Sequence, residues 1–174
     1  MFERMAKAMA IGFIALLIIS GVAVSRYDGT ASASPVLSAS DLSRKDVFGS
    51  ARLSVGERSN GVEICHRRLT ELSFAFARVK RTKNESEIDK ARRFCDCFAN
   101  QVEDRSSRMQ YAMAMTVLAK GYAIASPRSF PAFNEYKTAA GKHGMSADEF
   151  ETMRRELGRS LTQSAEQCAM NMTE

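Results

Sequence analysis

Two cysteines separated by one residue, Cys95 and Cys97, constrain the fold of this chain more than any other feature of its sequence. They lie in a segment whose apolar spacing is that of a helix, where successive residues are rotated by roughly 100°. Their side chains therefore point to nearly opposite sides of the helix and do not bond to each other, since a disulfide needs converging Cβ atoms. Each needs a different partner, Cys65 or Cys168, so one helix is tied to two others.

Apolar residues recur at alternating spacings of three and four along most of the chain, which is the pattern of amphipathic helices. Long helices are predicted over 61–81, 85–103 and 147–170, and another from a cap at Ser106 or Ser107 to residue 125, with a shorter helix over 129–140. No segment alternates apolar and polar residues for long enough to predict a strand. The predicted fold class is all-α: a four-helix bundle with an extra short helix, its neighbouring helices antiparallel because the connections are short.

The N-terminus has the pattern of an export signal. Arg4 and Lys7 precede an uncharged, mainly apolar run from Ala8 to Val24, the arrangement found in signal peptides. The run is also near the lower length limit for crossing a bilayer. Residues 1–25 are therefore predicted to be a signal peptide or, if uncleaved, an N-terminal transmembrane anchor in the inner membrane. Either prediction places the rest of the chain in the periplasm or outside the cell.

The four cysteines are an even number in a short, exported domain, which favours two disulfides over free thiols. In an antiparallel hairpin of the first two helices, Cys97 lies about 6 Å along the axis from the level of Cys65, and Cys95 about 9 Å. This favours bonds joining Cys65 to Cys97 and Cys95 to Cys168. The exchanged pairing remains an alternative.

The segment between the export signal and the first predicted helix has a different composition. Residues 26–58 are rich in Ser, Ala and Gly and show no sustained apolar period. This composition predicts a flexible linker or arm. The helical domain with its two disulfides is then expected over residues 59–174.

Basic residues cluster on the hairpin formed by the first two predicted helices, in a chain with a formal net charge of +5. We predict that this surface docks another envelope protein or an anionic envelope polymer. Nucleic acid is not an expected partner, because the domain is predicted to be exported. The candidate partner-binding residues are Arg78, Lys80, Arg81, Lys83, Arg92 and Arg93.

Sulfur-containing side chains suggest a second hypothesis, a periplasmic carrier of Cu(I), because soft sulfur ligands suit this ion. Methionines in apolar helices more often fill gaps in the core, and a cysteine in a disulfide is not a metal ligand. Metal binding therefore stays the alternative, and no cofactor is predicted. Its candidate ligands are Cys168, Met170, Met172, Met109 and Met113.

The sequence contains none of the motifs that would identify a reaction. It lacks a phosphate-binding loop, a dinucleotide fingerprint, a nucleophile elbow and a histidine-based metalloprotease helix. We therefore expect no enzyme and no catalytic residues. The prediction is a small exported helical protein that binds another macromolecule as an inhibitor, an immunity protein or an assembly factor.

Overall fold

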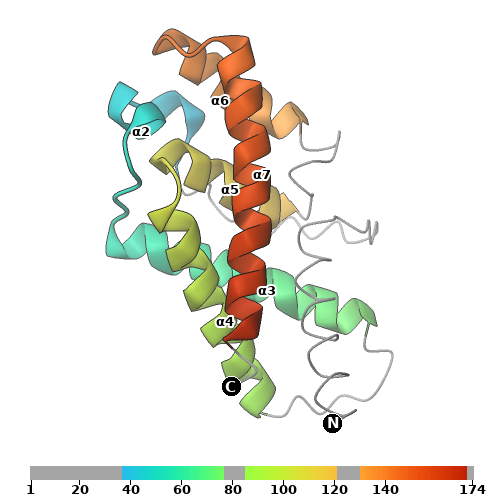
Figure 1. The fold of residues 1–174 in the computed structure, drawn as a ribbon. Helices are drawn as coiled ribbons and strands as arrows, with labels where there is room; N and C mark the ends of the chain where they lie inside the picture. The colour runs from blue at the N-terminus through green and yellow to red at the C-terminus, as the bar shows by residue number, and fades with distance from the viewer. Residues whose placement is uncertain (1–36, 77–84, 121–129, 172–174) are drawn as a thin grey trace.

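A computed structural model describes residues 37–76, 85–120 and 130–171 of the chain. In these ranges the chain forms six α-helices and one short 3₁₀ helix, with no strand. The predicted all-α class is therefore confirmed. The elements in chain order are η1 (Ala39–Asp41), α2 (Arg44–Phe48), α3 (Val55–Phe76), α4 (Glu85–Asp104), α5 (Arg108–Lys120), α6 (Phe130–Lys142) and α7 (Ala147–Met170), as Figure 1 shows.

Four of the α-helices begin where a serine side chain caps the first turn, α5 among them through Ser107 and Gln110. Ser146 and Glu149 form the predicted capping box at the start of α7, and Ser43 with Asp46 forms one at α2. At α3, Ser54 accepts from the backbone of residue 57, whose carboxylate accepts from Ser54 in return. This box satisfies donors that a helix otherwise leaves free at its N-terminus. It explains why α3 begins six residues before the predicted start at residue 61.

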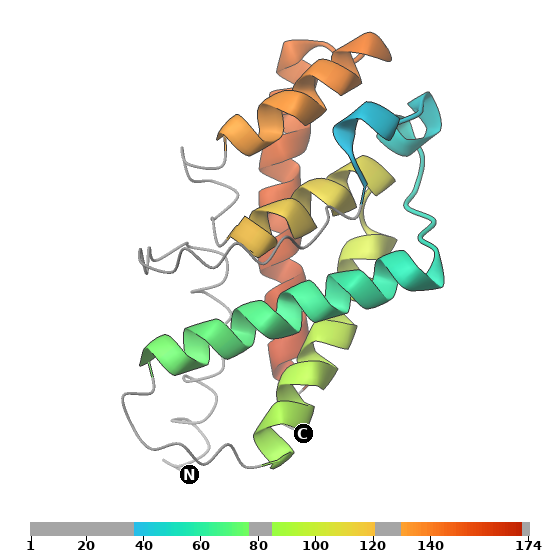
Figure 2. The ribbon, with the colours of Figure 1, turned by 180° about the vertical axis from the view of Figure 1, so that it is seen from behind.

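The long helices are not all aligned. Figures 1 and 2 show α4 and α7 side by side and running in opposite directions, whereas α3 crosses both of them steeply. This crossing differs from the near alignment of helices in a regular four-helix bundle. Antiparallel packing was predicted for helices that follow each other in the sequence, whereas the antiparallel pair seen here is α4 with α7, which are distant in sequence.

Helix α5 lies at the centre of the described structure. It contacts α2, α3, α4, α6 and α7, which agrees with the sequence, because a helix that is apolar nearly all round is buried. Its aromatic and thioether side chains are among the largest that are fully buried. The buried residues of α5 are Met109, Tyr111, Ala112, Met113, Ala114, Met115, Val117 and Leu118.

Residues 37–54, which we call the strap, fold against this domain although the sequence predicted a flexible arm over 26–58. Ala39, Leu42 and Val47 of the strap are buried in the core. The expected domain boundary at residue 59 falls inside α3. The strap was missed because its apolar residues are few and widely spaced. Residues 1–36, which include the predicted signal segment, lie outside the described ranges.

The backbone of the strap forms hydrogen bonds with residues that are far from it in the sequence. The Tyr136 hydroxyl donates to Leu37 O (2.9 Å), and His143 Nε2 donates to Leu42 O (2.7 Å). The amide of Ala51 in turn donates to the carbonyl of residue 106 (2.8 Å). These bonds fix the strap to α6, to the residue that follows it and to the turn between α4 and α5.

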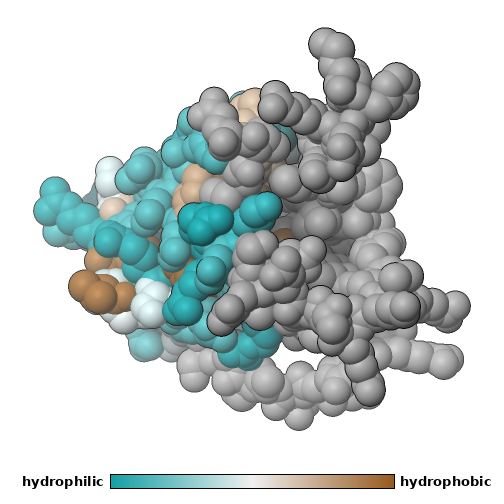
Figure 3. Space-filling model, turned by 90° about the horizontal axis from the view of Figure 1, so that it is seen from below, coloured by the Kyte–Doolittle hydropathy of each residue, from teal (hydrophilic) through white to brown (hydrophobic). Residues whose placement is uncertain are grey.

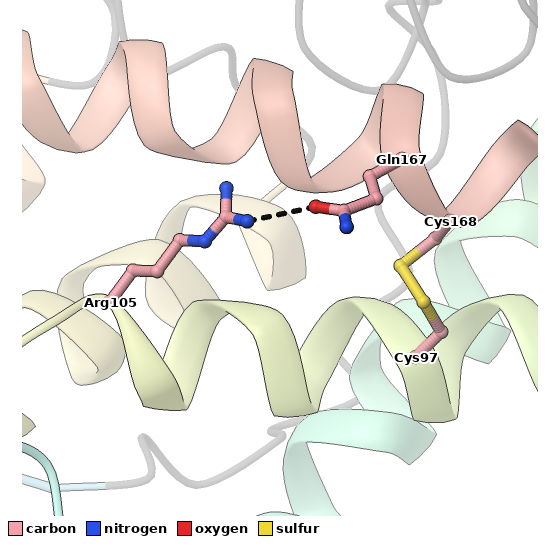
Figure 4. Close-up of a disulfide and its surroundings, with 4 residues drawn as sticks. All are labelled: Cys97, Arg105, Gln167 and Cys168. Atoms are coloured by element: carbon pink, nitrogen blue, oxygen red, sulfur yellow. Dashed lines mark hydrogen bonds between the residues drawn. A yellow bond between two sulfur atoms is a disulfide. The ribbon is translucent and has the colours of Figure 1, made fainter.

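Two disulfides join Cys65 to Cys95 and Cys97 to Cys168. The prediction of two bonds that tie α4 to two other helices is confirmed, but the preferred pairing of Cys65 with Cys97 and Cys95 with Cys168 was wrong. The exchanged alternative is the one observed. Figure 4 shows the bond between α4 and α7, with Arg105, the residue after α4, donating to the side chain of Gln167 (2.8 Å).

The wrong pairing came from treating α3 and α4 as a hairpin with parallel axes. Because the two helices cross, they touch over a short stretch only. Which cysteines can bond there depends more on the direction of their side chains than on their level along the helix axis. Cys65 and Cys95 are both on the buried faces of their helices, with exposed fractions of 3% and 0%. Cys97 points the other way, toward α7.

Disulfide mapping tests this connectivity. A protease that cuts before aspartate separates Cys95 from Asp96 and so places Cys95 and Cys97 on different peptides. Digestion of the unreduced, alkylated chain under acidic conditions, which suppress exchange, should give one cross-linked peptide pair with Cys65 and Cys95 and another with Cys97 and Cys168. Mass spectrometry of a pair containing Cys65 and Cys97 would contradict the structure.

Candidate functional site

The predicted partner-binding surface is only partly within the described residues. Arg92 and Arg93 lie on the exposed face of α4, where Asp89 and Asp96 are also exposed. This face therefore carries charges of both signs. Arg78, Lys80, Arg81 and Lys83 lie outside the described residues.

The candidate copper ligands do not form a set of available sulfur atoms. Met109 and Met113 are completely buried in α5, and Cys168 is bonded to Cys97. Met170 is 63% exposed at the end of α7, and Met172 lies outside the described residues. Within the described ranges, no group of three or more His, Cys, Asp or Glu residues is arranged to hold a metal ion.

A network of ion pairs that was not predicted from the sequence connects four helices. Arg108 of α5 donates to Asp46 of α2 (3.1 Å) and to Glu57 of α3 (2.5 Å). Beside it, Arg58 of α3 holds Glu103 of α4 with two hydrogen bonds of 2.7 and 2.9 Å. The network therefore joins the strap to the two helices that carry Cys65, Cys95 and Cys97.

Two of these carboxylates also serve as helix caps, and this double role lowers their pKa values. Burial raises the pKa of Asp46, but hydrogen bonds from Ser43 and Arg108 outweigh it and hold that pKa below its usual value. Burial likewise raises the pKa of Glu57, and bonds from Ser54 and Arg108 reverse the shift. Both groups are therefore ionised at neutral pH.

Glu103 is the most enclosed acid of the network. Hydrogen bonds from Arg58 lower its pKa, burial opposes them, and the backbone amide of Leu53 adds a further donor (3.3 Å). The side chain of Glu103 is 11% exposed, against 45% for that of Arg58. The Arg58 side chain therefore lies partly in solvent, and the Glu103 carboxylate that it holds is mostly enclosed by the protein.

The hydroxyl of Tyr111 is buried next to this network. Tyr111 is fully buried, and its hydroxyl has no hydrogen-bond partner among the described residues. Burial raises the pKa of Tyr111, with Glu103 adding to the shift. Gly61 of α3 makes room for it, because a Cβ atom at that position would collide with the Tyr111 hydroxyl.

The arrangement suits a structural clamp better than a catalytic site. A general acid or base works best when its pKa lies near the working pH, but these carboxylates are ionised and already bonded to arginine. Two sequence signals could have revealed the network: Ser43-x-x-Asp46 and Ser54-x-x-Glu57 are both capping-box patterns. Nothing in the sequence indicated that Arg108 would bridge the two boxes.

Comparison with protein-family models, curated proteins and solved structures found no match to this chain. Among the described helices, none is long and apolar enough to span a membrane. The apolar run from Ala8 to Val24 lies outside the described residues.

Replacing Arg108 with methionine tests the clamp. The variant keeps an apolar side chain but leaves two partly buried carboxylates without their cation, so we expect the free energy of unfolding at pH 7 to fall by about 2 kcal/mol. Urea denaturation followed by circular dichroism measures this change. Arg159→Met on the exposed side of α7 is the matched control and should change stability little.

The same variant should alter the acid sensitivity of the fold. Because the folded pKa values of Asp46 and Glu57 lie below their reference values of 3.8 and 4.5, their stabilisation is present above those values and is lost as the pH falls through the folded values. Arg108→Met removes part of this stabilisation, so its stability should fall less steeply on acidification. If the stability of the variant and of the natural chain falls equally steeply on acidification, the clamp is contradicted.

The contact between Gly61 and Tyr111 can be tested by a double-mutant cycle. Gly61→Ala should destabilise the fold by about 1 to 3 kcal/mol through overpacking, although alanine favours a helix by up to about 1 kcal/mol over glycine. Tyr111→Phe removes the hydroxyl that blocks the new methyl group, so the double variant should recover part of the loss. Additive effects in urea denaturation would show that the two residues do not interact.

Proposed function

We propose that this chain is an exported, non-enzymatic helical protein that binds another macromolecule in the periplasm or at the cell surface. The observation that carries the proposal is that all four cysteines are bonded in two disulfides. Structural disulfides form and persist in oxidising compartments and are rare in the cytosol. This supports the export predicted from the basic residues and apolar run at the N-terminus.

Binding rather than catalysis is supported by how the polar side chains are used. The carboxylates of the ion-pair network are occupied by arginines and helix caps, and the cysteines are cross-linked rather than available as nucleophiles. The exposed Arg92 and Arg93 are the described part of the predicted partner-binding surface. An inhibitor, an immunity protein or an envelope assembly factor fits these properties, with the helices forming a disulfide-linked bundle.

Site-specific photo-cross-linking in the native cells tests the proposal. A photoreactive amino acid at position 96 lies one helical turn from Arg92 and Arg93 on the exposed face of α4. We expect it to form a discrete adduct with a macromolecule in the envelope fraction, since an adjacent charged surface brings the partner within reach. Gel mobility and mass spectrometry of the adduct give the measurement.

Two controls decide the result. The same photoreactive group at position 163, an exposed site on α7, should give no such adduct. Arg92→Ala with Arg93→Ala should reduce the adduct at position 96 while leaving the circular dichroism spectrum unchanged. Equal adducts from both positions, or an adduct that does not depend on the two arginines, would contradict binding at this surface.

A further inference from the structure

We propose that α2 and the segment after it form a surface that docks on a membrane containing anionic lipid. We call this surface the docking edge and define it by the exposed residues Arg44, Lys45, Phe48, Arg52 and Val55. The inference depends on the proposed export only because export brings the domain to a membrane face. It concerns a different surface from Arg92 and Arg93 and can fail or succeed independently of it.

Along the docking edge, the basic side chains face solvent and the acidic side chains face the protein. Arg44, Lys45 and Arg52 are exposed, whereas the acids of this stretch, Asp46 and Glu57, turn inward to Arg108. The ion-pair network thus removes negative charge from the outer surface of a stretch that is nearly neutral in sequence. What remains outside is basic, which suits an anionic partner.

The neighbouring charged groups do not cancel this excess. Asp41 of η1 is the exposed acid nearest in sequence, against three exposed basic residues in the docking edge. On the other side, Arg58 is paired with Glu103. The docking edge therefore has an outward charge of about two positive units when Asp41 is included.

Large apolar side chains are exposed among these basic residues. Phe48 is 53% exposed and Val55 84%, and in the described part of the chain Met170 is the other exposed large apolar residue. Figures 1 and 2 show α2, the connection and the start of α3 along one edge of the molecule. In Figure 3 the described surface is mostly hydrophilic, with brown spheres at the side where α3 begins.

A lipid surface accounts for both properties together. Anionic headgroups attract Lys and Arg, and aromatic or aliphatic side chains enter the boundary between headgroups and acyl chains. An acidic polymer would satisfy the basic residues but would leave Phe48 and Val55 in water. The sequence adds a further reason if residues 1–25 stay as the uncleaved anchor, one of the two predictions for them, because only residues 26–43 then separate the bilayer from Arg44.

The absence of tryptophan from the chain permits a local test with the full-length protein. Phe48→Trp places a single fluorescent reporter in the docking edge, and it reports on that position even if residues 1–25 insert in the bilayer by themselves. The probes are vesicles of phosphatidylcholine alone or of phosphatidylcholine with phosphatidylglycerol in equal parts. We expect a shift of the emission to shorter wavelength with the anionic vesicles and little shift with the neutral ones.

Two variants make the test specific. Met170→Trp places the reporter at the C-terminal end of α7, away from α2 (Figure 1), and should show no shift with either vesicle. Adding Arg44→Gln, Lys45→Gln and Arg52→Gln to Phe48→Trp should raise the lipid concentration needed for the shift about a hundredfold, because each basic residue near an anionic surface contributes about fivefold. Circular dichroism verifies that each variant is folded.

The outcomes separate the possibilities. A shift at position 48 that requires anionic lipid and the three basic residues supports the docking edge. No shift, an equal shift with neutral vesicles, or a shift unaffected by the triple glutamine substitution would overturn it. None of these results changes the expectation for cross-linking at position 96, so the two proposals are judged separately.

Discussion

The two disulfides of α4 are the constraint on which the rest of the structure depends. Because Cys95 and Cys97 point to nearly opposite sides of one helix, a single turn of α4 is fixed to α3 on one side and to α7 on the other. On the chain-entropy account, bonds separated by 30 and 71 residues stabilise the fold by roughly 3.6 and 4.4 kcal/mol. Each is comparable to a large fraction of the net stability of a domain, so helices that cross steeply can be held without the continuous seam of an aligned bundle.

The ion-pair network extends this constraint to the strap. Neither disulfide reaches α2, yet Arg108 links Asp46 of α2 to Glu57 of α3, and α3 carries Cys65. The strap is therefore held against the cross-linked helices by partly buried charges as well as by its three buried apolar residues. The same pairing turns the acids of this stretch inward. Stability and the outward basic charge of the docking edge thus have one physical cause.

The sequence predicted those features that depend on local pattern. Apolar spacing located α4, α6 and α7 to within about two residues, because amphipathic period and capping residues are local properties. The strap and the pairing of Cys65 with Cys95 were not predicted, since both depend on how distant elements meet. Crossing angles are set by side-chain packing between helices, and the assumption of parallel axes gave the wrong partner for Cys65.

The candidate sites show the same division. Exposure of Arg92 and Arg93 and the burial of Met109 and Met113 follow from helical periodicity, but the bridging role of Arg108 does not. Arg108 is separated by 62 residues from Asp46 and by 51 from Glu57, and no sequence period connects them. In the sequence, the negative charges of Asp46 and Glu57 offset most of the positive charge of Arg44, Lys45 and Arg52, so the stretch has a net charge close to zero. Only the fold shows that the acids face inward and the bases outward. The charge of a surface depends on which side chains face solvent, and the net charge of the segment does not give this.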